Sequence, residues 1–292
     1  MFMNEKEIAK QIEKAKENII LLYAFNSTGK TRLSVAYKDY TKKLNKGNHA
    51  GVYYNAYSED LFVWENDEPH NNQDIYLKIV ESSLDGFITK FNDEGPIREK
   101  LIPYKPKFDF KLDYRKSDNP ELGFGSVKFY KSDDFEKQIK ISRGEERIFI
   151  WCFFLALFEI EGLSDVQNKH FFIDDPVSSL DDNNIYITAR LILDLFEKHC
   201  DTKKIIVTTH HMGLFSILQD WLSKGENREK FKSKRNQETK RGDKIFVKEI
   251  IEDKYLVRFL EVENNNYKLV GKKKGIVLYH LLLLQILNSR CR

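Results

Sequence analysis

Phe171-Phe172-Ile173-Asp174-Asp175-Pro176 decides the fold of this 292-residue chain. An apolar run that ends in two carboxylates predicts a buried strand that reaches the carboxyl edge of a sheet, where open α/β sheets bind their ligands. We expect Asp174 to hold Mg²⁺, which prefers oxygen ligands from one or two acids together with substrate phosphates. Asp175 would then orient or deprotonate a water molecule. The stretch therefore predicts a magnesium site, and such a site needs a phosphate-binding loop elsewhere in the chain.

The segment from Ala24 to Thr31 is the candidate for that loop. It reads AFNSTGKT, follows the apolar stretch 18–23 and precedes a helical pattern. It fits the P-loop pattern G-x-x-x-x-G-K-[ST] except at its first position, where Ala24 replaces glycine and is expected to limit access to positive φ. Lys30 would neutralise the phosphates and Thr31 would coordinate Mg²⁺, while backbone N–H groups surround the phosphates. The predicted nucleotide-binding residues of the loop are Asn26, Ser27, Thr28, Gly29, Lys30 and Thr31.

An ordinary polar turn before a helix is the alternative for this segment. The acidic strand makes the alternative less favoured, because both motifs are needed for one nucleotide site. The nucleotide interpretation requires the strand 18–23 and the acidic strand to lie side by side, so that Lys30 and Asp174 reach the same triphosphate.

Two later segments narrow the class of nucleotide-binding protein. The stretch 141–146 reads ISRGEE and opens an apolar helix expected to reach Ile160. Ser142 and the backbone of Gly144, at the N-terminus of that helix, would form an anion site. His210 follows the β-branched strand 204–209. A core or helix-capping role is the alternative for this histidine, and His211 is the less favoured candidate because it lies one residue past the strand end.

These segments resemble the ABC-type ATPases. The stretch 141–146 is similar to their signature motif, and His210 is similar to the switch histidine that contacts the γ-phosphate. In that superfamily the signature motif of one subunit closes over the nucleotide of another, so the resemblance implies a head-to-tail pair of sites. It assigns Asp175 to the place of the usual catalytic glutamate, where the shorter side chain predicts slow hydrolysis or a switch. The contacts implied across the dimer are those of Ser142, Gly144, Glu145 and Asp181.

A more specific resemblance is to the PrrC-type anticodon nucleases. It is carried by the segments 22–34, 53–67, 142–146, 172–182 and 208–210, and the aromatic-acidic segment 53–67 (YYNAYSEDLFVWEND) is its most specific part. The family also has alanine at the first P-loop position but usually has glycine where this chain has Ser27. The resemblance implies a bacterial anti-phage ribonuclease that cleaves the anticodon loop of a lysine tRNA. It also implies silencing by a type I restriction-modification complex and control through ATP or GTP.

This chain departs from the family pattern at the nuclease centre. The family pattern is an arginine, a glutamate four residues later and a histidine farther on, and no arginine here has glutamate at the fourth following position. Arg190 has Asp194 at that offset but lies within the ATPase part. We therefore expect the nuclease centre to be missing and the chain to be incomplete at its C-terminus, with 281–292 unlike the rest and His280 no part of a catalytic triad.

The segment 53–67 has two interpretations when it is taken without the family. It occupies the place where ABC-type ATPases keep a glutamine that senses Mg²⁺ and the γ-phosphate, and Asn55, Glu59 or Asp60 could substitute for it. Alternatively it is a half-buried aromatic hairpin that packs on the sheet. We expect a strand at 52–55, followed by an exposed turn that contains the acids and Trp64.

Composition favours a cytoplasmic protein. The three cysteines have no metal or redox spacing, which is typical of a reducing compartment. The N-terminus is charged and lacks a secretory pattern. The longest apolar run, 148–160, is shorter than the ~20 residues that a membrane span needs. We therefore expect no membrane partner.

Charge is concentrated near the C-terminus. Residues 224–292 contain 18 Lys and Arg against 9 Asp and Glu, a net charge of +9, so the first 223 residues carry −6 of the total of +3. A basic appendage of this kind fits contact with an RNA backbone. A solvated loop is the alternative, since acids are interspersed among the basic residues.

The predicted fold class is α/β: a P-loop NTPase with an ABC-type head, a mostly parallel sheet flanked by helices and a small basic C-terminal appendage. We expect the NTPase domain over 1–223, with an irregular insert at 66–138, and a remnant of a tRNA-nuclease domain over 224–292. Within the insert we expect a helix over 74–91 and irregular β structure over 95–135. Alternative functions are a DNA-repair-type ABC ATPase without nuclease activity and a decayed nucleotide-binding regulatory protein.

Overall fold

The computed structural model describes residues 3–66, 74–82, 88–89, 91, 93–115, 119–131, 134–159, 170–177, 180–241, 244–263 and 266–271. The α-helices are α1 (Glu5–Lys14), α2 (Lys30–Leu44), α3 (Ala56–Glu59), α5 (Gly95–Leu101), α6 (Arg143–Glu159), α7 (Asp182–His199) and α8 (Met212–Lys224). The first strands are β1 (Ile19–Tyr23), β2 (Gly51–Tyr54), β3 (Phe62–Glu65), β4 (Tyr76–Ile79), β5 (Phe108–Tyr114), β6 (Phe124–Lys131) and β7 (Asp134–Gln138). The remaining strands are β8 (His170–Asp174), β9 (Lys204–Thr209), β10 (Lys232–Arg241), β11 (Lys244–Asp253), β12 (Tyr255–Glu263) and β13 (Asn266–Val270).

A six-stranded sheet in the order β13-β12-β1-β9-β8-β2 forms the centre of the molecule. Five of its strands are parallel, and β13 is antiparallel at the edge. Every residue of β1 and β8 is buried, as is typical of parallel strands that are covered on both faces. The prediction of a mostly parallel α/β sheet is confirmed.

The predicted P-loop strand and the predicted acidic strand both belong to this sheet, but they are not hydrogen-bonded neighbours. Strand β9 lies between β1 and β8, so the expectation that the two lie side by side is wrong. The register nevertheless aligns the strand ends, since Tyr23 pairs with Thr209 and Asp174 pairs with Thr208. The motifs after β1, β8 and β9 therefore meet at one carboxyl edge.

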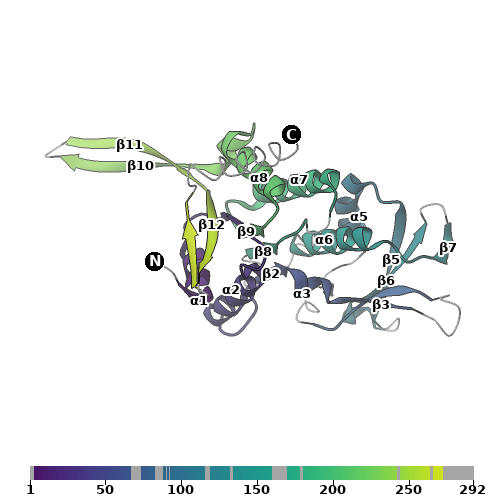
Figure 1. Cartoon of the computed structure of the whole chain (residues 1–292). Coiled ribbons are helices and arrows are strands. Elements are labelled where there is room, and N and C mark those ends of the chain that lie inside the picture. Colours follow the sequence, from purple (N-terminus) through teal and green to yellow (C-terminus); the bar gives the residue numbers. More distant parts are fainter. Residues whose placement is uncertain are drawn as a thin grey trace, which may run out of the picture.

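Helices cover both faces of the central sheet (Figure 1). On one face α1 and α2 pack with alternate sheet residues such as Leu22 and Phe172. On the other face α6 packs with a second set that includes Leu21 and Phe171. Helix α6 is buried continuously from Ile148 to Phe158 because it lies between two sheets. Its aromatic side chains contact the central sheet on one side and the antiparallel sheet on the other.

The second sheet is antiparallel, in the order β3-β4-β6-β5 with β7 paired to β6. It lies at the end of the molecule opposite the β10–β11 hairpin (Figure 1). The predicted helix over 74–91 is wrong where it is described, because 76–79 is the strand β4, which pairs with β3 and β6. The helical spacing of apolar residues was outweighed by cross-strand pairing. Residues 83–87 and 90 lie outside the described residues.

Two expectations about neighbouring segments have different outcomes. Irregular β structure at 95–135 is confirmed by β5, β6 and the start of β7, with the short helix α5 before them. The exposed turn at Trp64 is wrong, since this residue lies in β3, packs on Phe129 and donates its indole N–H to Glu146 at 2.8 Å. The alternative of a half-buried aromatic hairpin over 53–67 holds only in part, because this segment contains the end of β2, helix α3 and strand β3, and the pairing partner of β3 is β4, outside the segment.

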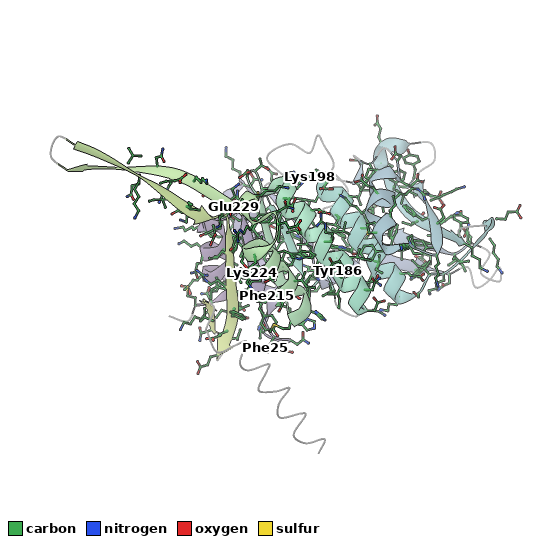
Figure 2. The ribbon with its side chains drawn as sticks, turned by 90° about the horizontal axis from the view of Figure 1, so that it is seen from above. Phe25, Tyr186, Lys198, Phe215, Lys224 and Glu229 are labelled. Carbon is green, nitrogen blue, oxygen red and sulfur yellow. The ribbon has the colours of Figure 1, made fainter. Side chains whose placement is uncertain are left out.

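The C-terminal region divides into two parts. Strands β10 and β11 pair over ten positions and form a hairpin that stands away from the helices, with Glu229 close to its base (Figure 2). Strand β12 then pairs with β1, and β13 closes the sheet edge. The predicted boundary at residue 223 therefore does not separate two folded units, because 255–270 completes the central sheet. The predicted features at Lys272–Lys274, His280 and 281–292 lie outside the described residues.

Candidate nucleotide-binding site

The loop between β1 and α2 has the backbone that a phosphate-binding turn requires. Gly29 adopts φ 83° and Ser27 adopts φ 63°, both in the left-handed region. Glycine visits this region cheaply and other residues do not, so the strain falls on Ser27. The expectation that Ala24 carries the conformational cost is wrong, because Ala24 is not among the described residues with positive φ; it is buried and its N–H donates to Thr209 O at 3.0 Å. Gly29 is also required sterically, since a Cβ there would lie 2.5 Å from the Tyr267 hydroxyl.

Lys30 begins α2 and is only 8% exposed. Its ammonium group donates to the carbonyl oxygens of Ala24 (3.5 Å) and Phe25 (3.3 Å). It also lies 3.8 Å from Asp175 Oδ2. A buried cation held by loop carbonyls and a carboxylate is the arrangement that an anionic phosphate can enter.

Asp174 ends β8 as a buried carboxylate between two hydroxyl groups. Thr31 Oγ1 donates to its Oδ2 at 2.8 Å, and Thr208 Oγ1 donates to its Oδ1. Burial raises the pKa of Asp174 above its ordinary value, and the two threonine hydrogen bonds oppose that rise. A hydroxyl and a carboxylate oxygen in contact are the protein ligands expected for Mg²⁺ that also binds phosphates, so the donor set fits this ion. Within the described ranges, no group of three or more His, Cys, Asp and Glu residues could hold a metal by itself.

Asp175 and His210 lie together at the same edge. Asp175 adopts φ 57° and accepts hydrogen bonds from Thr209 Oγ1 (3.0 Å) and the His210 N–H (3.3 Å). Its Oδ2 also contacts His210 Nδ1. The capping role considered for His210 belongs instead to His211, whose Nδ1 accepts from Leu214 N at 3.2 Å at the start of α8.

A pocket of about 550 Å³ joins the loop, Lys30 and the two aspartates, and His210 is not among its lining residues. The loop and acidic-strand residues that line it are Asn26, Ser27, Gly29, Lys30, Thr31, Arg32, Asp174 and Asp175. Two further lining residues, Glu59 and Arg147, form an ion pair with Nε and Oε2 3.3 Å apart. Arg147 was missed because a single arginine within an apolar helix has no motif that identifies it.

Of the three candidates to replace the glutamine that senses Mg²⁺ and the γ-phosphate, one lines the pocket and two do not. Glu59 lines the pocket. Asn55 is buried, and its side-chain amide donates to Ser34 Oγ at 2.9 Å outside the pocket. Asp60 is exposed and is not among the lining residues.

The remaining predicted residues do not line this pocket. Ser142 and Glu145 exchange hydrogen bonds around the start of α6, with Ser142 N to Glu145 Oε2 at 2.9 Å. No atom lies within 4 Å of the position that a Cβ on Gly144 would take. Asp181 is exposed and caps α7 by accepting from Asn184 N at 2.8 Å. Thr28 closes the turn of its own loop by donating to Phe25 O at 2.7 Å.

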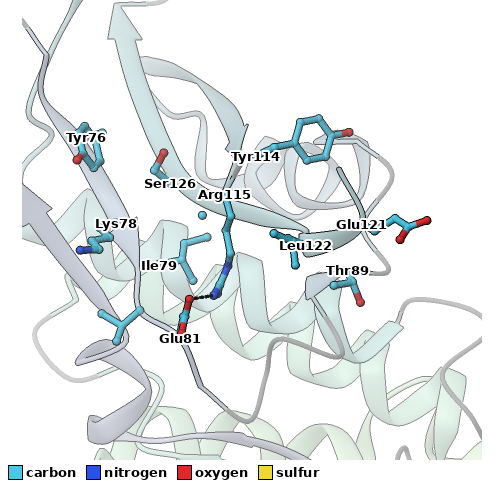
Figure 3. Close-up of a pocket in the computed structure, with 12 residues that line it drawn as sticks. Tyr76, Lys78, Ile79, Glu81, Thr89, Tyr114, Arg115, Glu121, Leu122 and Ser126 are labelled. Atoms are coloured by element: carbon cyan, nitrogen blue, oxygen red, sulfur yellow. Dashed lines mark ion pairs between the residues drawn. The ribbon is translucent and has the colours of Figure 1, made fainter. Parts of the chain in front are cut away.

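A larger cavity, of about 870 Å³, lies on the antiparallel sheet and shares no lining residue with the pocket at the loop (Figure 3). Arg115 extends into it and pairs with Glu81 at 3.5 Å. None of the predicted site residues lines this cavity.

Comparisons with known proteins agree with the architecture. Residues 111–279 match the model of a family described as an AAA domain. The chain is 32% identical over 248 residues to a protein of Escherichia coli named "Anticodon nuclease", and the match covers 73% of this chain and 61% of that protein. The chain thus spans about three fifths of the length of this relative.

Solved structures align with the chain at lower sequence identity. The Smc head domain of Pyrococcus yayanosii aligns with 70% of this chain and 30% of its own, at 13% identity and a TM-score of 0.39. A complex of an archaeal ribosomal stalk protein with the ribosome recycling factor aABCE1 aligns with 88% of this chain and 39% of that chain, at 15% identity and a TM-score of 0.41. Among the described helices of the present chain, none is both long and apolar enough to cross a bilayer.

Proposed function

The chain belongs to the family described as an AAA domain, and on that premise we propose that it is a Mg²⁺-dependent nucleoside triphosphatase that binds ATP or GTP. The observation that carries the proposal is the hydrogen bond of 2.8 Å between Thr31 and Asp174, which come from segments 143 positions apart. It joins the end of the phosphate loop to the acidic strand inside one pocket. The two proposed Mg²⁺ ligands are thereby in contact next to Lys30.

Each group then has a chemical role. Lys30 neutralises the β- and γ-phosphates, and the loop N–H groups with the N-terminus of α2 bind their oxygens. Thr31 and Asp174 would hold Mg²⁺, which would supply charge neutralisation and polarisation of the phosphoryl oxygens. Asp175 orients or deprotonates the attacking water, and His210 contacts the γ-phosphate and positions Asp175 through its Nδ1.

Ser142, Gly144, Glu145 and Asp181 are proposed to act on the nucleotide of a second copy. The support is their position: Ser142 and Asp181 are exposed, all four lie outside the pocket of their own chain, and they lie at the N-termini of α6 and α7. A helix N-terminus attracts phosphate. The proposal therefore includes a head-to-tail dimer.

At the level of the whole protein, we propose that this head regulates an anticodon nuclease of bacterial anti-phage defence in the cytoplasm. Similarity to the E. coli anticodon nuclease supports this proposal. Lysine tRNA would bind the basic region, including the β10–β11 hairpin, and a type I restriction-modification complex would be the silencing partner. Cleavage of lysine tRNA in the presence of Mg²⁺ and nucleotide tests the nuclease component separately from the ATPase.

The ATPase proposal is tested with fluorescent ATPγS and GTPγS, with and without Mg²⁺, on the wild type and Lys30→Ala. We expect Mg²⁺-dependent binding that is lost in the variant, whereas Lys224→Ala, an exposed surface lysine outside the pocket, serves as the matched control and binds normally. Single-turnover hydrolysis by Asp175→Asn should fall by about 10²–10⁴-fold, as expected for loss of a general base. Unchanged hydrolysis would remove Asp175 from the mechanism, and Mg²⁺-independent binding that ignores Lys30 would refute the site.

A further inference from the structure

The ion pair between Glu59 and Arg147 is the feature of the pocket that the proposed roles leave unused. Glu59 is the last residue of α3, and Arg147 lies one turn into α6. Their side chains are only 24% and 21% exposed, and both line the pocket that contains Lys30. A paired arginine that faces a phosphate-binding loop can exchange its carboxylate for a phosphate, because the guanidinium fork matches both groups.

The backbone positions of both residues are fixed by packing at the end of β2. Asn55 and Ser58 cap the short helix that carries Glu59, through buried hydrogen bonds. Trp151, one turn after Arg147, packs edge-on against Tyr54 at 5.1 Å. Burial raises the pKa of Tyr54, and the charges of Glu59, Arg147 and Asp175 all act on it. The pair and the proposed catalytic carboxylate therefore share one electrostatic environment.

Among the three cations that line the pocket, Arg147 is the one whose acid partner has no other proposed role. Lys30 is already committed to the loop carbonyls and Asp175. Arg32 extends towards Glu5, 3.9 Å away, and its side chain is 57% exposed. Arg147 instead pairs with Glu59, an acid of the pocket to which no part in metal binding or hydrolysis is assigned.

We propose that Arg147 is a γ-phosphate sensor that leaves Glu59 and binds the terminal phosphate of the nucleotide held by its own chain. The proposal deepens the proposed function and depends on it, since it requires a triphosphate at Lys30. A nucleoside diphosphate lacks the terminal phosphate and leaves the ion pair intact. Arg147 is thus a specificity-determining residue for triphosphate over diphosphate.

The position of Arg147 also connects the two proposed faces of the head. Ser142 and Gly144 lie at the start of the same helix, less than two turns before Arg147. A change of partner at Arg147 therefore acts on the helix whose exposed N-terminus is proposed to meet a second copy. A triphosphate bound in the pocket would in this way affect the surface that is proposed to meet the second copy.

The test measures the affinities for ATPγS and ADP, with Mg²⁺, of the wild type, Arg147→Gln, Arg147→Lys and Glu59→Gln. Arg147→Gln should weaken ATPγS binding by about 10- to 100-fold, the range of a lost charge-assisted hydrogen bond, and should change ADP binding by less than about threefold. Arg147→Lys should recover part of the loss because it keeps the charge. Glu59→Gln should strengthen ATPγS binding, since Arg147 no longer has a competing carboxylate.

Arg190→Gln is the matched control, because Arg190 forms an ion pair with Asp194 on α7 outside the pocket. It should leave both affinities unchanged. If the wild type binds both nucleotides and Arg147→Gln weakens both equally, the pair has only a structural role and the inference falls while the proposed function stands. A loss of ATPγS affinity in Glu59→Gln would also overturn it. If the wild type binds neither nucleotide, the proposed function and the inference fall together.

Discussion

Replacement of Thr31 by alanine should destabilise the nucleotide-free protein as well as impair its function. The Thr31 hydroxyl is one of two that donate to the buried Asp174 carboxylate, at 2.8 Å. A hydrogen bond to a charged group contributes about 1.5–3 kcal/mol, and its loss leaves the carboxylate less well solvated. At about 2.1 cal/mol/K per residue, the 292 residues give an unfolding entropy of about 0.6 kcal/mol/K. Thr31→Ala should therefore lower Tm by about 2–5 °C.

Differential scanning calorimetry without Mg²⁺ or nucleotide measures the change in Tm. Titration with Mg²⁺ and ATPγS measures the loss of nucleotide binding. Thr31→Ser keeps the hydroxyl and should retain most of both properties. Thr28→Ala removes a hydroxyl of the same loop that donates to a backbone carbonyl instead, so it should leave Mg²⁺ dependence intact. If Thr31→Ala unfolds at the wild-type temperature and binds Mg²⁺-nucleotide normally, the contact with Asp174 has neither assigned role.

Two further predictions concern a buried carboxylate and a half-buried one with opposite pKa shifts. Burial raises the pKa of Asp174, so its charge costs stability at neutral pH, and Asp174→Asn should raise Tm while abolishing Mg²⁺-dependent nucleotide binding. The gain in Tm should shrink as the pH falls and the wild-type carboxyl protonates; a lower Tm at neutral pH would contradict this. Burial also raises the pKa of Glu159, but the neighbouring side chains of His199, Lys100 and Lys198 outweigh it and hold the value at about 2, below the ordinary 4.5. Glu159→Gln should therefore cost about 1–3 kcal/mol at pH 7, and chemical denaturation should show this deficit disappearing between pH 4.5 and 2; a pH-independent deficit would show that packing, not charge, is responsible.

The sequence predicted the strands and loops that local patterns specify. The apolar runs before Lys30 and Asp174, and the β-branched run before His210, are all buried strands of one sheet. Their alignment follows from parallel pairing, because parallel strands place their carboxyl ends on one edge. The chemistry at that edge could therefore be predicted before the strand order was known.

The elements that were mispredicted depend on partners distant in sequence. Residues 76–79 have apolar neighbours at helical spacing, yet they form a strand because β3 and β6 pair with them on both sides. The region 255–270 was assigned to a basic appendage by its charge, although 255–260 (YLVRFL) is a mostly apolar run of strand length. Its pairing with β1 could not be read from composition.

Glu59 and Arg147 were the least predictable parts of the site. They are 88 positions apart in sequence and meet only because α3 and α6 both pack at the end of β2. The segment that contains Glu59 did point to a group that senses the γ-phosphate, but three residues remained as candidates. Only tertiary packing selects Glu59 among them.

A crystal structure with Mg²⁺ and ATPγS would test the central claim most directly. We predict the γ-phosphate against Lys30 and Mg²⁺ bound by Thr31 and Asp174, whose direct hydrogen bond is then replaced by shared coordination of the ion. A nucleotide bound elsewhere, or a metal that contacts neither Thr31 nor Asp174, would contradict the account.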